Sequence, residues 1–174
     1  ICQDDMDSKL RQIGNMGNIY SQAMLTIVAA YGESAHAGLP GVRPFSRNSI
    51  QHTELVQNIL LANELLHLDD TLLQSHWNTR GWTYQENELS RRCLIFGENQ
   101  VYFRCNRKEF KEDSGFRDVA HGLSRAFRIR GEKHPIWNSY RRAVRSFTKL
   151  TFSFETDVIH AFQGVVNLLQ PAFK

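Results

Sequence analysis

The chain has 174 residues, of which 41% are apolar and 11% aromatic, values typical of a folded globular domain and not of a disordered segment. Basic residues exceed acidic residues by only three, so the net charge gives no argument for nucleic-acid binding. No apolar run reaches the roughly 18 residues that a membrane span requires. Two basic segments, Arg125–His134 and Tyr140–Lys149, are interpreted as solvated helix faces, with phosphate binding as the alternative.

The three cysteines are odd in number and include no C-x-x-C pair, which argues against a disulfide scaffold and a structural zinc site. The seven histidines are scattered, with no pair spaced to place two imidazoles on one face, so no metal site is expected. The chain opens on Ile1-Cys2-Gln3, with no charged-then-apolar start, so no signal peptide is expected here. We expect a single domain over residues 1–174 that is truncated at its N-terminus, where the first strand is missing. Truncation at its C-terminus as well is left as an open alternative.

The first predicted element is a helix, because apolar residues recur at spacings of three and four; they are Met6, Leu10, Ile13, Met16 and Tyr20. Asp4, Asp5 or Asp7 can cap its N-terminus. Met24–Tyr31 is a continuous apolar run with β-branched residues, which predicts a strand covered on both faces. A helix followed by a buried strand indicates a βαβ unit and hence a parallel sheet.

The middle of the chain is less regular. Residues 32–44 contain three glycines and two prolines and predict a loop. Residues 45–75 fit either one helix or a strand leading to a short helix, and the punctuation by Asn and Asp favours the second. A further helix is expected to begin near Gly81, capped by Asn78 or Thr79.

The second half predicts a hairpin and then helices. Residues 92–105 form two apolar runs around Gly97, a hairpin signal. Residues 106–133 are polar and read as a connection. Helices are expected from Ile136 and from about Thr156 to Leu169, where Pro171 ends the second. The predicted fold class is therefore α/β: a parallel sheet flanked by helices, with an added β-hairpin and a helical C-terminal part.

Glu86 is the carboxylate most suited to chemistry. On a helix it shares a face with Trp82, four residues earlier, and Leu89, three residues later. Such apolar neighbours desolvate the carboxyl and raise its pKa, which suits acid–base work or stabilisation of a cation. The alternative is a structural carboxyl that hydrogen-bonds Arg80 or a backbone amide. Glu88 is expected to be a solvated partner of the following arginines.

Other nucleophiles have less support. A Ser-His-Asp triad lacks a G-x-S-x-G elbow, and neither standard phosphate loop is present. Cys105 could be a nucleophile, but no histidine stands beside it in sequence, so a structural thiol is the preferred interpretation.

Four segments together resemble the fungal heterokaryon incompatibility (HET) domain, in the order that family shows. They are "ICQDDMDSKLRQIGNMGNIYSQAMLTIVAA", "GLPGVRP", "WNTRGWTYQENELSRRCLIFGENQVYFRC" and "TDVIHAFQGVV". The resemblance implies a cytoplasmic module of fungal non-self recognition that triggers growth arrest or programmed cell death when different hyphae fuse.

HET domains are in turn regarded as distant relatives of TIR domains, which implies a TIR-like (flavodoxin-like) fold. Enzymatic TIR domains cleave nicotinamide from NAD⁺ with a glutamate four residues after a tryptophan, and Trp82 and Glu86 have that spacing. By this resemblance Glu86 is the catalytic residue and NAD⁺ the substrate, with no separate cofactor. Trp82 or Tyr84 would wall the site, and Arg80 would contact a phosphate.

Two functions are therefore carried forward. The first is a TIR-like NAD⁺ glycohydrolase. The second is a non-enzymatic signalling or adaptor module that acts by self-association or by recruiting another incompatibility protein. Neither nucleic acid nor a membrane span is expected in either case.

Overall fold

The computed structural model describes residues 5–34, 36–47, 51–106, 108–113, 115–117 and 136–173. The expectations for Ile1 to Asp4, for the basic segment 125–134 and for most of the connection 106–133 lie outside these residues. The helices are α1 (Met6–Gln22), α2 (Leu68–Gln74), the 3₁₀ turn η1 (His76–Thr79), α3 (Thr83–Leu89), α5 (Ile136–Phe147), α6 (Asp157–Leu169) and the 3₁₀ turn η2 (Gln170–Phe173). The strands are β1 (Thr26–Ala29), β2 (Thr53–Val56), β3 (Ile59–Ala62), β4 (Arg92–Phe96), β5 (Val101–Cys105), β6 (Glu109–Lys111) and β7 (Gly115–Arg117).

The main sheet is mixed, with the strand order β1-β4-β5-β6-β7. Only β1 and β4 are parallel, with Val28 opposite Ile95, and the other three pairings are antiparallel. The α/β class and the hairpin at residues 92–105 are confirmed, but the prediction of a parallel sheet is wrong beyond this one pair. The hairpin is the reason: it is part of the sheet itself, and strands joined by tight turns pair antiparallel.

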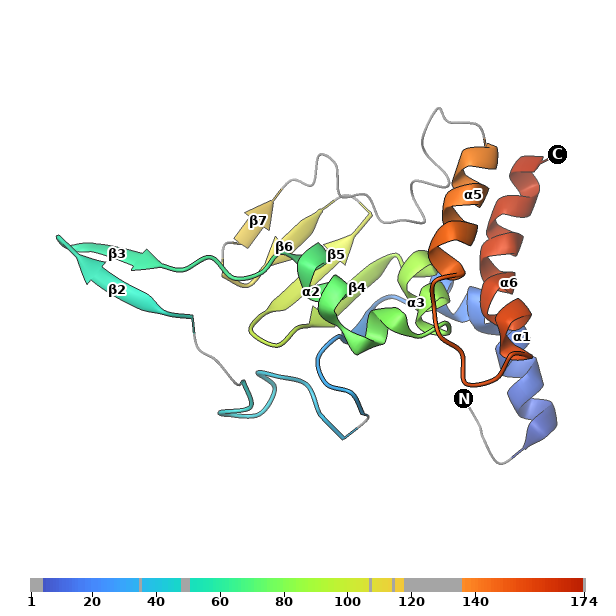
Figure 1. Cartoon of the computed structure of the whole chain (residues 1–174), viewed down its shortest axis with the longest axis horizontal. Helices are drawn as coiled ribbons and strands as arrows, with labels where there is room; N and C mark the ends of the chain where they lie inside the picture. The colour runs from blue at the N-terminus through green and yellow to red at the C-terminus, as the bar shows by residue number, and fades with distance from the viewer. Residues whose placement is uncertain are drawn as a thin grey trace.

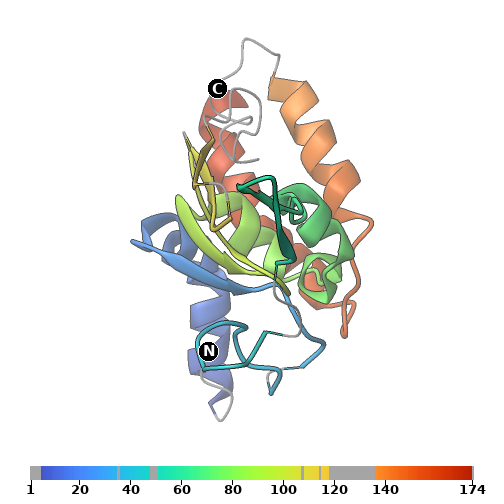
Figure 2. The same cartoon turned by 90° about the vertical axis from the view of Figure 1, so that its left-hand side faces the viewer.

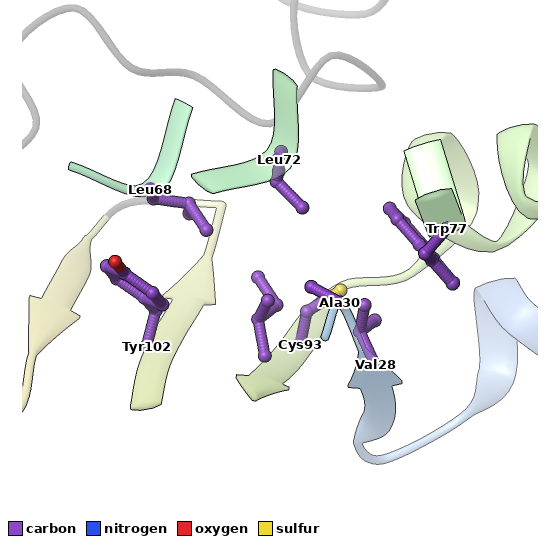
Figure 3. Packing of buried hydrophobic residues seen from close by; sticks show 8 residues of the cluster. Val28, Ala30, Leu68, Leu72, Trp77, Cys93 and Tyr102 are labelled. Atoms are coloured by element: carbon purple, nitrogen blue, oxygen red, sulfur yellow. The ribbon is translucent and has the colours of Figure 1, made fainter. Parts of the chain in front are cut away.

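One face of the sheet carries the first core. Val28, Cys93 and Tyr102 point from the strands toward residues of α2 and η1 (Figure 3), and Ile95 belongs to the same buried cluster. The apolar run predicted a β1 strand covered on both faces. This prediction is wrong, because the residues of β1 alternate between buried and exposed. Val28 is 1% exposed and Ile27 is 57% exposed. Only the Val28 side of the strand meets the core, and Ile27 lies on the other face.

A second core joins the helices. Tyr84 and Leu89 of α3 pack with Ala143 and Phe147 of α5 and with buried residues of α6. Figure 1 shows α1, α5 and α6 gathered at one end of the molecule, and in Figure 2 they lie behind the sheet. The helical C-terminal part is thus confirmed. None of the helices in the described ranges has the length and apolar character needed to cross a bilayer.

The irregular middle of the chain forms two structures. Residues 53–62 are the antiparallel β2–β3 hairpin, and α2 follows, which confirms the strand-then-helix interpretation in outline. The helix expected at Gly81 begins at Thr83 instead. Asn78 and Thr79 belong to η1, whose N-terminus is capped by the Ser75 side chain.

Candidate active site at Glu86

The short α3 helix places Glu86 near two tryptophans that precede the helix in the chain. Trp77 lies in η1 and Trp82 directly precedes the helix. The turn between them is held by the Thr83 hydroxyl, which donates to the carbonyl oxygens of Trp77 and Arg80, both at 2.7 Å. This local geometry positions both indoles and the carboxyl around one space.

That space is a pocket of about 470 Å³ between α1, β1, η1 and α3. Its lining combines apolar and aromatic side chains with Thr83 and three charged side chains; the residues are Ile13, Met16, Tyr20, Ile27, Ala29, Trp77, Arg80, Trp82, Thr83, Glu86 and Asp157. The partly exposed face of β1, which carries Ile27, forms one wall. A volume of this size, lined by aromatic side chains beside charged groups, falls within the range of small-molecule sites.

The Glu86 carboxyl is partly buried, and this burial raises its pKa to about 7. Hydrogen bonds from the Trp77 indole and the Tyr20 hydroxyl and the positive charge of Arg80 act in the opposite direction. Burial is the largest effect, which agrees with the desolvation expected from its neighbours. The partners differ from those expected, because Trp77 and Tyr20 donate to the carboxyl. A carboxyl with this pKa can both bind and release a proton near neutrality.

Tyr20 is the reciprocal partner of Glu86. Burial and the neighbouring carboxylate raise the pKa of its phenol to about 12, so the hydroxyl stays protonated and donates. Tyr20 comes from α1, more than sixty residues away in sequence. It belongs to the apolar helix face predicted from spacing, but nothing in the sequence linked that face to Glu86.

Replacing Tyr20 with phenylalanine is expected to raise the pKa of Glu86 from about 7 toward about 8, because a donor to the ionised carboxylate is lost. The titration of the carboxyl carbon of Glu86 in ¹³C-labelled protein would measure this. Tyr140→Phe is the matched control, because Tyr140 packs against Trp137 and Phe173 away from this pocket. An unchanged titration in Tyr20→Phe would show that the hydroxyl does not act on Glu86.

The other predicted site residues divide into two groups. Trp82 and Arg80 line the pocket with Glu86, and the Trp82 indole donates to Asp157 Oδ2 at 3.0 Å, which ties α3 to the start of α6. Tyr84 does not line it. Its ring packs at 5.3 Å from that of Phe147, and its hydroxyl donates to the Ala143 carbonyl at 3.1 Å. The expectation that Tyr84 walls the site is therefore corrected. Tyr84 is two residues from both Trp82 and Glu86, so its side chain leaves the α3 helix on a different side and packs in the second core.

Glu88 also departs from expectation. It is 1% exposed, whereas the following arginines, Arg91 and Arg92, are exposed. It is therefore not a solvated surface partner of those charges. Two positions separate Glu86 from Glu88, and on a helix this spacing turns the two carboxyls toward different neighbours.

The two cysteines of the described ranges are weaker candidates for a reactive group than Glu86. Cys93 is buried, and burial raises the pKa of its thiol, while Cys105 is partly buried at the end of β5. The same ranges contain no group of three or more His, Cys, Asp or Glu side chains able to hold a metal ion.

A comparison with protein families gives one match. Residues 1–86 match the family described as Heterokaryon incompatibility protein (HET). This part of the chain belongs to the HET family. The HET segment contains α1, β1, η1 and the first half of α3, and it ends at Glu86 itself. Its description links the protein to heterokaryon incompatibility.

The HET match covers most of the pocket lining but leaves Asp157 outside it. Neither a curated protein nor a solved structure matches the chain. The TIR-like fold and the catalytic role of Glu86 therefore both stay predictions.

Proposed function

We propose that the HET pocket cleaves NAD⁺ between the ribose and nicotinamide, with Glu86 as the catalytic carboxylate. The observation that carries this proposal is a partly buried carboxyl with a pKa of about 7, enclosed by indoles in a pocket of about 470 Å³. This arrangement places a negative charge at a partly desolvated position, where it stabilises a developing cation more strongly than it would in bulk water.

In the proposed reaction the bond between ribose C1′ and the nicotinamide nitrogen breaks, and nicotinamide leaves with the electron pair. Positive charge develops on the ribose, and ionised Glu86 stabilises it. Water then attacks C1′ and loses a proton, which gives ADP-ribose, nicotinamide and H⁺. Trp77 and Tyr20 hold the carboxylate by donating to it.

Two further residues fit parts of the substrate. The nicotinamide ring of NAD⁺ is cationic, and an indole such as that of Trp82 favours a cation over its face. Arg80 is exposed at the pocket and carries the guanidinium that suits a phosphate oxygen. Loss of NAD⁺ would then be the route from this HET protein to growth arrest and programmed cell death in fungal hyphae.

The test is NAD⁺ consumption by the purified chain, with nicotinamide and ADP-ribose separated by chromatography. Glu86→Gln is expected to lower the rate by about 100-fold or more, because it removes the charge that the transition state needs. Glu98→Gln is the matched control, since Glu98 is exposed in the β4–β5 turn, away from this pocket. Its rate should equal that of the wild type.

Two outcomes would contradict the proposal in different ways. Cleavage that survives Glu86→Gln would remove Glu86 from the mechanism. Absence of cleavage in a folded wild type would reject NAD⁺ hydrolysis and favour the non-enzymatic adaptor.

A further inference from the structure

The β2–β3 hairpin projects away from the sheet and the helices and is exposed along both strands (Figure 1). Cross-strand partners share a face, so Leu55 and Leu60 lie on one side and Val56, Ile59 and Leu61 on the other. These five side chains are between 44% and 68% exposed. A two-stranded hairpin with apolar side chains on both faces is marginally stable in water by itself, and such a surface indicates an interaction site.

The local backbone specifies this hairpin and not a loose loop. Gln57 and Asn58 have φ values of 50° and 62°, and two consecutive left-handed residues form the tight turn that matches strand twist. A two-residue turn also sets the register of the strands. The exposed leucines therefore occupy defined positions.

The base of the hairpin is attached to the main sheet. The chain leaving β3 bonds to β5 and its neighbours: Gln100 Nε2 and the Tyr102 hydroxyl donate to the Leu66 carbonyl at 2.9 and 2.8 Å. The buried Lys111 ammonium lies 3.3 Å from Glu64 Oε1. These contacts attach the chain just after β3 to the main sheet, which limits the freedom that the hairpin loses on binding.

The outer edge of β3 offers free backbone groups. The Asn63 N–H donates to the His52 carbonyl at 3.1 Å, so this pair is hydrogen-bonded. Pairs alternate along an antiparallel ladder, and Leu55–Leu60 is therefore a non-hydrogen-bonded pair whose N–H and C=O groups point outward. In the described part of the chain, no third strand pairs with this hairpin.

The charges distinguish the two edges. Residues 59–62 of β3 carry no charge, whereas β2 carries Glu54. Pairing β2 with its own copy would bring two carboxylates close together, which is unfavourable. Pairing β3 with its own copy has no such penalty and brings leucines together across the new strand pair.

We propose that β3 pairs antiparallel with β3 of a second copy of this chain, which creates a four-stranded sheet across a two-fold axis. The same edge supplies the donors and the acceptors on both sides, so the surface is complementary to itself. Residues 51–64 contain no Lys or Arg, which makes an anionic lipid surface a poorer occupant. This dimer does not depend on NAD⁺ cleavage, because none of its residues lines the Glu86 pocket.

The test is the mass of the chain by sedimentation equilibrium over a range of concentrations up to about 1 mM. The wild type should shift from monomer to dimer, and Leu60→Pro should weaken the dimer at least about tenfold, since it removes an outward N–H from the β3 edge. Leu55→Pro is the matched control. It makes the same change on the β2 edge, at the cross-strand partner of Leu60, and should leave the dimer intact.

A charge exchange separates loss of the interface from loss of folding. Leu60→Glu and Leu60→Lys should each be monomeric alone and should dimerise when mixed, because only the mixture places opposite charges across the pair. A wild type that stays monomeric throughout, or a dimer unaffected by these changes, would overturn the proposal. A monomer that sediments with phosphatidylcholine vesicles would overturn it in favour of a lipid surface. Since the readout is mass, none of these outcomes bears on catalysis by Glu86.

Discussion

Gly164→Ala is expected to lower the free energy of unfolding by about 3 kcal/mol, even though alanine favours a helix over glycine by about 1 kcal/mol. Gly164 lies in α6 where it crosses α1. A Cβ there would collide with Gln85 Oε1 and lie 2.8 Å from Leu89 Cδ1 and 3.0 Å from Gly17 Cα.

The neighbours of Gly164 cannot easily yield. Gln85 is 1% exposed, and its amide donates to the His160 carbonyl at 2.8 Å, so its side chain is held in place. Gly17 contributes backbone, and moving it means moving α1. The helices would have to separate, which would loosen the second core and the α1 wall of the Glu86 pocket.

Denaturant unfolding of Gly164→Ala beside Gly14→Ala would measure this effect. Gly14 is in α1, one turn from Gly17, and a Cβ there meets nothing within 4 Å. Gly14→Ala should therefore gain up to about 1 kcal/mol from helix propensity alone. Equal stability of the two variants would show that the crossing of α1 and α6 tolerates a methyl group.

The second large effect is the pH dependence that Glu86 imposes on stability. Its pKa is about 7 in the folded chain, against 4.5 for a solvent-exposed glutamate. Below pH 4.5 the carboxyl is protonated in both states and carries no penalty. Between these values the unfolded chain ionises first, so the free energy of unfolding falls as pH rises and levels off above pH 7.

Glu86→Gln removes this dependence while keeping the size of the side chain and an oxygen that accepts from Trp77 and Tyr20. The variant should therefore be more stable than the wild type at pH 8, by up to about 3 kcal/mol, with the advantage disappearing toward pH 4. Urea unfolding of both proteins between pH 4 and 8 gives the difference curve, and Glu98→Gln is the control. A flat difference would show that Glu86 ionises in the folded chain as it does in water.

Together with the cleavage assay, this experiment distinguishes a catalytic carboxyl from a structural one. If Glu86→Gln is more stable but inactive, the folded chain sacrifices stability to keep an ionisable group in the pocket, as functional sites commonly do. If it is less stable, the carboxyl contributes to folding, and the structural alternative gains support.

Where the sequence succeeded, short-range patterns carried the information. The spacing from Met6 to Tyr20 identified α1, and the two apolar runs around Gly97 identified the β4–β5 hairpin. The tryptophan-to-glutamate spacing drew attention to Glu86, and the HET segments were readable from residue order alone. Each of these signals lies within one element or one stretch of chain, where periodicity and turn chemistry act directly.

The tertiary structure decided what each element faces. Sequence did not show that Trp77 and Tyr20 donate to Glu86, that Tyr84 turns into the helical core, or that Glu88 is buried. Nor did it show that, among the described strands of the main sheet, only β1 and β4 pair in parallel, or that the β2–β3 hairpin projects away from the sheet and the helices. Periodicity reports the direction of a side chain relative to its own backbone, whereas a pKa, a pocket and an interface depend on residues brought close from distant parts of the chain.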